Sequence, residues 1–418
     1  MVRLAAAGAP ARAWRFGACV ALSLSALSCG GGGGSGSLAP GTSTPTAPNV
    51  ASVVVDAGPT STSADVNTLF TTVTVCMPGS TTSCQTIDHI QVDTASYGLR
   101  ILAPVLTLSL PVQTAANGAS LLECTQFVDG YSWGPVALAD VQISGESASS
   151  VPVQVIGDPS FTTVPSDCSS IGPAEDTVAA FGANGILGIG VFAQDCGAGC
   201  VTVAQPATYY ACSSTQCQAT TVPLASQVPN PVTLFATDKN GVVIQLPSVA
   251  AQGAATVTGF LIFGIDTQAN NKSGGQSVLT LDSNAGEFTT IFNTQSLTQS
   301  FLDTGSNGYF FNDTGLQQCT NTSFMNFYCP ANPQSLSAVL HGQNAVSATV
   351  NFTVGNAETL EANDPSLVAF ATLAGTFPTT ATAGNTFDWG LPFYYGRTVY
   401  TAIENATTSV GMGPYVAF

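Results

Sequence analysis

Two aspartates stand at the ends of apolar, strand-like runs and are followed by residues of the same kinds. Asp93 occurs in IQVDTASYGLRIL and Asp303 in FLDTGSNGYFF, each followed by a threonine, a small residue and a serine. Two carboxyl groups held face to face, about 3 Å apart, share one proton because both cannot ionise cheaply. One can then take a proton from a bound water while the other donates to a carbonyl under attack. Such a pair permits amide hydrolysis without a covalent intermediate.

The residues after each aspartate are of types that can support such a pair. A small residue lets backbone N–H groups approach the carboxylates, since a bulky Cβ would obstruct the turn. The threonine hydroxyls can hydrogen-bond to the opposite loop, and the serine hydroxyls can hold the outer carboxylate oxygens. The supporting residues predicted in this way are Thr94, Ser96, Thr304, Gly305 and Ser306.

Other catalytic arrangements have few suitable residues. The chain contains two histidines, His89 and His341. A Ser–His–Asp triad would need one of them, and neither has a nucleophile elbow nearby. A metal site with two histidine ligands is possible by count, but no spacing of ligand residues supports it. His89 lies in the run leading to Asp93, where we expect a structural role, and we predict neither a metal nor a cofactor.

The composition is typical of a folded, exported β protein. The chain has 418 residues, of which 7% are charged and 45% hydrophobic, with a net charge of −17. Disordered chains carry more charge and fewer β-branched residues. A surface that binds nucleic acid needs many Lys and Arg residues, and this chain has seven in all. We therefore expect no nucleic-acid partner.

The N-terminus has the pattern of a targeting segment. Two arginines precede FGACVALSLSAL, which is too short to span a bilayer, and SCGGGGGSGS follows. The small residues before Cys29 and the glycines after it resemble a bacterial lipoprotein signal. This implies a signal peptide at 1–28, lipidation of Cys29 and a flexible tether at 29–50. Gly30 resembles the outer-membrane sorting pattern. The alternative is an ordinary cleaved signal peptide on a secreted or periplasmic protein.

The cysteines beyond Cys29 indicate disulfide bonds. There are ten, an even number, in a chain expected to be exported. The pairs Cys76 with Cys84 and Cys319 with Cys329 are close enough in sequence to join the strands of hairpins. The segments DCGAGC and ACSSTQC could instead form a four-thiolate zinc site, but the exported context favours disulfides. The remaining connectivity stays open.

Strand and turn patterns fill the chain from Val50 onward. TLFTTVTVCMPGSTTSCQTIDHIQVDTAS has the pattern of a strand, a Pro-Gly turn and a second strand, and Lys239-Asn240-Gly241 predicts a hairpin turn. No long stretch has the apolar period of a helix. Each half carries an Asp loop and, far downstream, an apolar segment with glycine, NGILGIG or FDWGLPFYYGRTVY. These repeats predict a duplicated, mostly β chain.

These motifs resemble those of the pepsin-like, two-lobed aspartic peptidases over most of residues 51–418. The hairpin leading to Asp93, then NGILGIG, FLIFGID, LTLDSNAGEFTT, FLDTGSNGYFF and WGLPFYYGRTVY, are similar to that family's segments in the same order. The resemblance implies an all-β pepsin-like fold with pseudo-twofold related lobes, at 51–268 and 269–418, and a cleft between them. It also implies that Asp93 and Asp303 form the catalytic dyad. The chain resembles, too, an uncharacterised family of proteobacterial lipoproteins, which implies no function.

The chain departs from that family's pattern at several positions. Ala95 replaces the usual glycine, and the methyl costs roughly 1 kcal/mol if this position needs a positive φ. Asp388 stands where an aliphatic residue is expected, and would either raise the pKa of the dyad or point to solvent. FVDGYSWGPVALADVQIS resembles the flap hairpin, with Phe127 at the position of the flap tyrosine. Tyr131 and Trp133 are candidate tip residues, with packing inside the loop as the alternative.

Two function classes follow, and a third is weaker. The first is an exported, lipid-anchored, monomeric aspartic endopeptidase that binds a peptide or protein substrate in extended form. The alternative is a catalytically inactive pepsin-fold surface lipoprotein that binds peptide or glycan in the cleft. In the third, a structural lipoprotein of the cell envelope, the Asp loops are only turns that join the lobes.

Overall fold

The computed structural model describes residues 47–59, 66–213, 216–377 and 383–418, and their secondary structure is almost entirely β. The predicted signal peptide, Cys29 and most of the tether lie outside these residues. Within the described ranges, no helix has both the length and the apolar character needed to cross a membrane.

The first half of the chain contributes all of its strands to one 15-stranded sheet. The strands are β1 Val50–Val55, β2 Leu69–Cys76, β3 Cys84–Asp93, β4 Tyr97–Leu102, β5 Ser120–Gln126, β6 Tyr131–Ile143, β7 Glu146–Ile156, β8 Gly185–Ile189, β9 Tyr209–Cys212, β10 Cys217–Ala219, β11 Gly241–Gln245 and β12 Val257–Phe263. Strands β2 and β12 alternate between buried and more exposed residues in part of their length, as strands with one face on a core do, whereas β8 and β9 are buried along their whole length.

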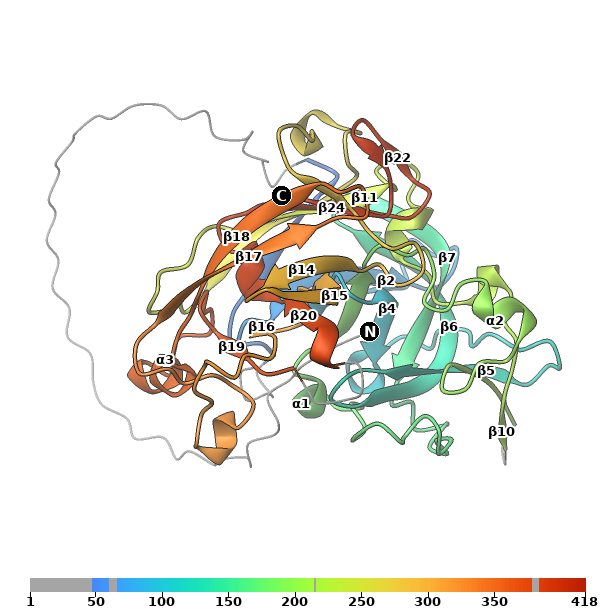
Figure 1. Cartoon of the computed structure of the whole chain (residues 1–418). Helices are drawn as coiled ribbons and strands as arrows, with labels where there is room; N and C mark the ends of the chain where they lie inside the picture. Colours follow the sequence, from blue (N-terminus) through green and yellow to red (C-terminus); the bar gives the residue numbers. More distant parts are fainter. Residues whose placement is uncertain (1–46, 60–65, 214–215, 378–382) are drawn as a thin grey trace, which may run out of the picture.

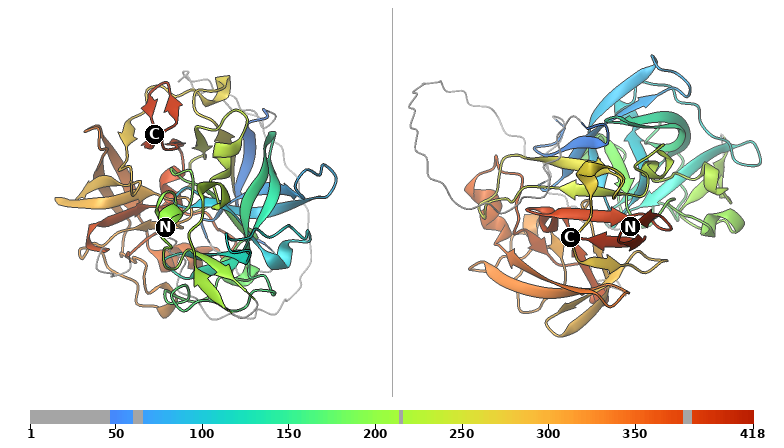
Figure 2. Two further views of the ribbon diagram at one scale, coloured as in Figure 1. Left: turned by 90° about the vertical axis from the view of Figure 1, so that its right-hand side faces the viewer. Right: turned by 90° about the horizontal axis from the view of Figure 1, so that it is seen from above.

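The second half forms a seven-stranded sheet in the order β18-β17-β14-β15-β20-β16-β19. Figure 2 shows this half, in orange and red, on one side of the molecule and the blue-to-green half on the other. The strands of the second half are β13 Val278–Thr280, β14 Phe288–Phe292, β15 Gln295–Leu302, β16 Tyr309–Phe310, β17 Gln334–His341, β18 Ser347–Val354, β19 Ala374–Gly375, β20 Thr386–Trp389, β21 Thr398–Ala402, β22 Thr407–Thr408, β23 Gly411–Met412 and β24 Tyr415–Ala417.

Two features of the large sheet organise the lobes. A pairing of β6 with β2 closes the strands β6-β7-β4-β8-β3-β2 into a barrel. Strands β21, β24 and β13 of the second half continue the sheet from β11, so strands of both halves are hydrogen-bonded side by side (Figure 1). The predicted fold class is confirmed: the chain is all-β, with a two-lobed, pepsin-like architecture.

Helices are few and short. The α-helices of the described residues are α1 Val178–Phe181, α2 Gly199–Thr202 and α3 Ala357–Asn363. Short 3-10 helices lie at Ala103–Val105, Leu224–Ser226, Pro231–Leu234, Ala269–Asn271, Thr322–Phe324, Ala383–Asn385 and Leu391–Tyr394. This agrees with the absence of a helical apolar period in the sequence.

The predicted disulfides are present, but one predicted hairpin is wrong. The bonds are Cys76–Cys84, Cys124–Cys168, Cys196–Cys200, Cys212–Cys217 and Cys319–Cys329. Lys239-Asn240-Gly241 does not join two strands, because the segment before it begins with a 3-10 helix at Pro231–Leu234. Asn230 caps this helix through a bond from Val232 N at 3.1 Å, and Pro231 occupies its first turn.

Candidate active site

Asp93 is positioned by three strands of the first lobe. It is the last residue of β3, which runs parallel to β8, and lies opposite Gly188. Strand β4 returns on the other side of β8 in the antiparallel direction. A Cβ on Gly188 would collide with the backbone of Ser96 and Tyr97. This glycine is therefore required for β8 to pass beside the Asp93 loop.

The second lobe repeats this arrangement around Asp303. Strand β15 runs parallel to β20, with Leu302 opposite Trp389, and β16 returns antiparallel to β20. A Cβ on Gly390 would collide with the carbonyl oxygen of Gly308. The predicted apolar-glycine segments therefore have the same task in both halves: each passes beside an Asp loop.

The two loops are bonded to each other through their threonines. Thr94 Oγ1 donates to Leu302 O at 3.1 Å and accepts from Thr304 N at 3.0 Å. In return, Thr304 Oγ1 donates to Val92 O at 2.7 Å and accepts from Thr94 N at 3.2 Å. All of these groups are buried, so the four bonds fix one loop against the other.

The threonine bonds bring Asp93 and Asp303 together. The Oδ1 atoms of Asp93 and Asp303 each lie 2.9 Å from the position that a Cβ on Gly305 would occupy. The distance between the two Oδ1 atoms is therefore at most twice 2.9 Å. Ala95 N donates to Asp93 Oδ1 at 2.7 Å, and Gly305 N donates to Asp303 Oδ1 at 2.6 Å. The side chains of the aspartates are 2% and 0% exposed. The geometry therefore fits a pair of carboxyl groups that share a proton.

Asp303 is in a setting that favours its protonated form. Burial raises its pKa well above the usual value, and the charges of Asp93 and Asp388 and a hydrogen bond with Asp93 raise it further. The bond from Ser306 acts in the opposite direction. A carboxyl group that keeps its proton in this setting can donate it to a carbonyl oxygen.

The two serines differ in their contacts. Ser306 Oγ lies 2.9 Å from Asp303 Oδ2, as expected for a residue that holds the outer oxygen. It also lies 2.5 Å from Asp388 Oδ2. Ser96 Oγ is buried and has no hydrogen-bond partner among the described residues, so the prediction that it holds Asp93 is wrong for this conformation.

Two departures from the expected pattern are explained by the geometry. The φ angle of Ala95 is not positive, so its methyl group brings no left-handed strain. Asp388 is completely buried and does not point to solvent. A third carboxyl group therefore lies next to the dyad, linked to Asp303 through Ser306.

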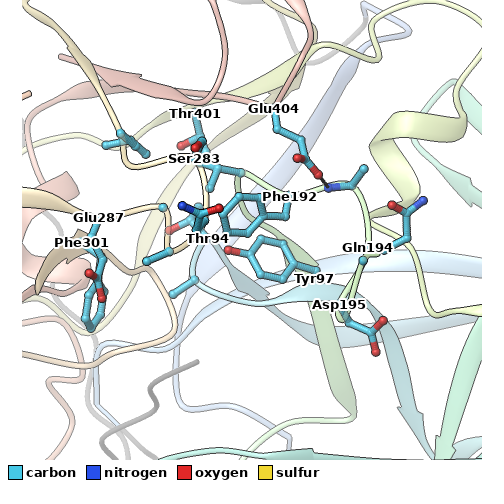
Figure 3. A pocket seen from close by; sticks show the side chains of 18 of the residues that line it. Thr94, Tyr97, Phe192, Gln194, Asp195, Ser283, Glu287, Phe301, Thr401 and Glu404 are labelled. Carbon is cyan, nitrogen blue, oxygen red and sulfur yellow. Dashed lines mark hydrogen bonds between the residues drawn. The ribbon is translucent and has the colours of Figure 1, made fainter. Parts of the chain in front are cut away.

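A cavity of about 950 Å³ lies between the lobes (Figure 3). Its wall includes Thr94 and Ala95 from the first Asp loop and Phe301 and Leu302 from the strand that leads to the second. Aromatic rings line its middle, where the ring centroids of Tyr97 and Phe192 are 5.3 Å apart. The described lining contains three carboxylates and no Lys or Arg; the carboxylates are Asp195, Glu287 and Glu404.

The predicted flap exists as a hairpin, but its aromatic residues do not face this cavity. Strands β5 and β6 pair from Leu122 to Gln126 and are joined by the turn at 127–130. Trp133 is 5% exposed, donates from Nε1 to Phe161 O at 2.9 Å and packs edge-on against Tyr210. It is therefore a core residue. Tyr131 packs against the same core cluster and is absent from the described cavity wall.

The residue at the hairpin tip that reaches the other lobe is Val128. It packs against an apolar cluster of the second lobe that includes Phe310 and Phe377. Phe127, placed by the resemblance at the flap tyrosine, is 1% exposed and packs against Phe181 in the first lobe. The sequence gives no signal for Val128, because a lone valine in a turn does not identify its partner.

Asn67 is a second residue that sequence reasoning missed. Its Nδ2 donates to Asn307 O at 2.7 Å and to Phe370 O at 2.9 Å. Its Oδ1 accepts from Phe370 N at 2.7 Å and from the hydroxyl of Tyr395 at 2.9 Å. All four bonds join the first lobe to the second beside the Asp303 loop. The φ angle of 56° suits asparagine, but the partners cannot be read from the sequence.

Among the described residues, one group of potential metal ligands lies close together: Cys319, Cys329 and Glu358. The two cysteines are bonded to each other, which leaves a single carboxylate. This group is therefore not suited to hold a metal ion.

Comparisons with known proteins show the family to which this chain belongs. A crystal structure of an aspartic proteinase from Irpex lacteus is similar to this chain with a TM-score of 0.48 and 14% sequence identity, over 88% of this chain and 96% of that one. No curated protein matches the sequence. The model of one family, described as protein of unknown function (DUF3443), matches residues 45–418. The chain belongs to this family.

Proposed function

We propose that this protein is an aspartic endopeptidase-like hydrolase that cleaves peptide bonds between its two lobes. The observation that carries the proposal is the meeting of Asp93 and Asp303 on loops tied together by Thr94 and Thr304. Four features support it: the pair is buried, is flanked by backbone N–H donors, lies next to an interlobe cavity and has a raised pKa at Asp303.

In the proposed reaction, the oxygen of a bound water attacks the peptide carbonyl carbon. Asp93 takes a proton from that water, and Asp303 donates the shared proton to the carbonyl oxygen. The resulting tetrahedral intermediate collapses when the C–N bond breaks, the nitrogen receives the proton held by Asp93, and one hydroxyl group of the intermediate returns its proton to Asp303. The products are a carboxyl group and an amine, and the dyad again holds one proton. An extended substrate would place its side chains in the cavity between the lobes.

The test is cleavage of denatured casein by the full-length protein between about pH 3 and 6, with and without pepstatin, which inhibits the resembled family. The same assay is run on Asp93→Asn, Asp303→Asn and a control, Asp364→Asn, whose side chain is exposed. We expect pepstatin-sensitive cleavage that falls at least about a thousandfold in both dyad variants and persists in the control. Cleavage that survives in either dyad variant would refute the proposal.

The second candidate is a protein of the same fold that binds peptide or glycan without cleaving it. Two observations favour this reading: both aspartates are nearly inaccessible to solvent, and Val128 packs across to the second lobe. If the wild-type protein is inert in the casein assay while a peptide library still binds to it, this candidate replaces the first.

We also propose export and anchoring through a lipid on Cys29, with a monomeric protein at the outer membrane and no membrane contact besides the lipid. The disulfides among the described residues support an oxidising compartment. Metabolic labelling with a radioactive fatty acid tests this. We expect label on the wild-type protein and none on Cys29→Ser, whereas label on both would exclude Cys29 as the anchor.

A further inference from the structure

Asp388 is a buried carboxyl group at a position that is apolar in the other lobe. It lies in β20 opposite Phe301 of β15, two residues before Gly390. The equivalent position in the first lobe is Ile186, which lies opposite Gln91, two residues before Gly188. Asp388 is completely buried. An ionisable group in such a place is costly unless it is neutral or well paired.

The hydrogen bonds of Ser306 constrain the protonation of its neighbours. Its Oγ lies 2.9 Å from Asp303 Oδ2 and 2.5 Å from Asp388 Oδ2. A serine hydroxyl carries one hydrogen, so it can donate to only one of these two oxygens. The other contact is a hydrogen bond only if that carboxyl group is protonated and donates to Ser306.

The protonated group is identified by the second oxygen of Asp388. Asp388 Oδ1 is buried and has no hydrogen-bond partner within the described parts of the chain. Ionisation of Asp388 would place negative charge on a buried oxygen that accepts no hydrogen bond, which is strongly disfavoured. The outer oxygen of Asp303, in contrast, receives the Ser306 bond, and its inner oxygen receives the bond from Gly305 N.

We propose that Asp388 is a positioning residue that remains protonated, donates its hydrogen to Ser306 and thereby turns the Ser306 hydroxyl toward Asp303. The inference deepens the proposed function and rests on it for its catalytic consequence. The resting site then holds two protons on three carboxyl groups, one shared by Asp93 and Asp303 and one on Asp388.

The groups around Asp388 are consistent with a neutral acid. The negative charge of Asp93 opposes the ionisation of Asp388. Asp388 is linked to Asp303 through the hydroxyl group of Ser306. A phenol that interacts with the charge of Asp388 is that of Tyr394, in the 3-10 helix after β20. No Lys or Arg in the described structure forms an ion pair with Asp388. Burial raises the pKa of Asp388 well above its usual value, while the hydrogen bond with Ser306 acts in the opposite direction.

This arrangement predicts how the site responds to rising pH. Once Asp388 loses its proton, the Ser306 hydrogen turns to Asp388, and Asp303 loses a donor while gaining a negative neighbour. The three carboxyl groups therefore titrate together, and the pKa at which activity is lost is a property of all three and not of one residue. Asp388→Asn keeps an N–H donor for Ser306 but cannot ionise, so one route of proton loss disappears. Asp388→Ile copies Ile186 and removes the donor.

The first test is the pH–rate profile of the full-length protein. We expect Asp388→Asn to retain activity and to shift the alkaline limb upward by about one pH unit. We expect Asp388→Ile to lower kcat about tenfold. The matched control is Asp238→Asn, a buried aspartate in another cavity, whose φ of 40° suits asparagine. An alkaline limb that is unchanged in Asp388→Asn would overturn the inference.

The second test does not depend on activity. Carboxyl NMR of protein with isotopically labelled aspartate, at about pH 6, should show a protonated carboxyl signal that is missing from Asp388→Asn. If that variant does not fold, the signal is identified by elimination with Asp93→Asn and Asp303→Asn. An ionised signal for residue 388 would overturn the inference. A protonated signal in a protein that cleaves nothing would support it while counting against the proposed function.

Discussion

Thr94 and Thr304 exchange hydrogen bonds between the two lobes, each hydroxyl accepting from the backbone N–H of the other residue, at 3.0 Å and 3.2 Å. Each hydroxyl also donates to a carbonyl oxygen of the opposite lobe. The Asp loops are therefore fixed by backbone groups of both lobes, and not only by the packing of either. This explains how a pair of buried carboxyl groups, which repel each other when both are ionised, can be held close together.

The first prediction concerns this connection. Thr304→Val keeps the shape of the side chain but removes the donor to Val92 O and the acceptor for Thr94 N, both buried. Each unsatisfied group costs about 1–3 kcal/mol, so we expect a loss of about 2–4 kcal/mol in the free energy of unfolding, measured by thermal denaturation. The control is Thr258→Val on an exposed position of β12. A loss no larger than that of the control would contradict the prediction.

The second prediction concerns the space between the aspartates. A Cβ on Gly305 would lie 2.8 Å from Asp93 Cγ and 2.9 Å from the Oδ1 atoms of Asp93 and Asp303. Gly305→Ala should therefore push the carboxyl groups apart and reduce peptide cleavage by at least about a hundredfold. Ala95→Gly should change cleavage only a few-fold, since no strain is present to relieve. Equal activities of the two variants in the casein assay would show that the contact at Gly305 does not matter.

The third prediction concerns a buried ion cluster around Arg100, which lies on β4, the strand that follows the first Asp loop. Arg100 is completely buried and contacts Glu123 Oε1 at 2.5 Å and Asp195 Oδ2 at 3.5 Å. Asp195 also forms the wall of the interlobe cavity. Arg100→Met leaves two buried carboxyl groups without a cation, and we expect a loss of about 3–5 kcal/mol in unfolding free energy.

The control for Arg100→Met is Arg397→Met, which removes a partly exposed arginine that stacks on Phe393 with its guanidinium carbon 4.6 Å from the ring centroid. We expect its effect to be smaller, because no buried carboxylate loses its partner. If both substitutions lower the melting temperature equally, the buried cluster contributes no more than the contacts of Arg397, which are the Phe393 ring, the Phe393 carbonyl oxygen and Tyr309.

The parts of the site that could be predicted from the sequence are those with a local cause. An apolar run ending in Asp-Thr identifies a strand followed by a turn, and this was sufficient to find Asp93, Asp303 and the two threonines. The disulfides Cys76–Cys84 and Cys319–Cys329 could also be predicted, because the two cysteines of each pair are close in sequence and have few other partners. The repeated apolar-glycine segments indicated the duplication, and so the fold.

The parts that could not be predicted depend on contacts between distant segments. Asn67 is bonded to Phe370, 303 positions away, and no local pattern records that contact. Trp133 reads as a flap residue from its neighbours, but its ring is held by Phe161 and Tyr210 in the core. Val128 reaches the second lobe only because the hairpin is placed there by the barrel. Sequence reasoning found the hairpin but left open whether its aromatic side chains lie at the tip or pack inside.

The last prediction concerns stability as a function of pH at Glu146, away from the dyad. Glu146 is 7% exposed and lies in a cavity of about 520 Å³ with Asp238. Burial, the charge of Asp238 and a hydrogen bond with it raise the pKa of Glu146 from 4.5 to about 7. The folded protein therefore binds this proton more tightly than the unfolded chain does. Stability must then fall as the pH rises from 4.5 to about 7, and the fall must level off above that range.

Glu146→Gln cannot ionise, so it should lack this part of the pH dependence. Asp303 and Asp388 also have raised pKa values and act in the same direction, so the wild-type curve alone does not isolate Glu146. The difference in melting temperature between the variant and the wild type does, because the other two groups are present in both. That difference should move in favour of the variant between about pH 4.5 and 7 and stay constant above. Glu361→Gln, on the exposed side of α3, provides the matched control. Parallel curves for wild type and Glu146→Gln would mean that Glu146 ionises as easily in the folded protein as in the unfolded chain, and that its burial carries no electrostatic cost.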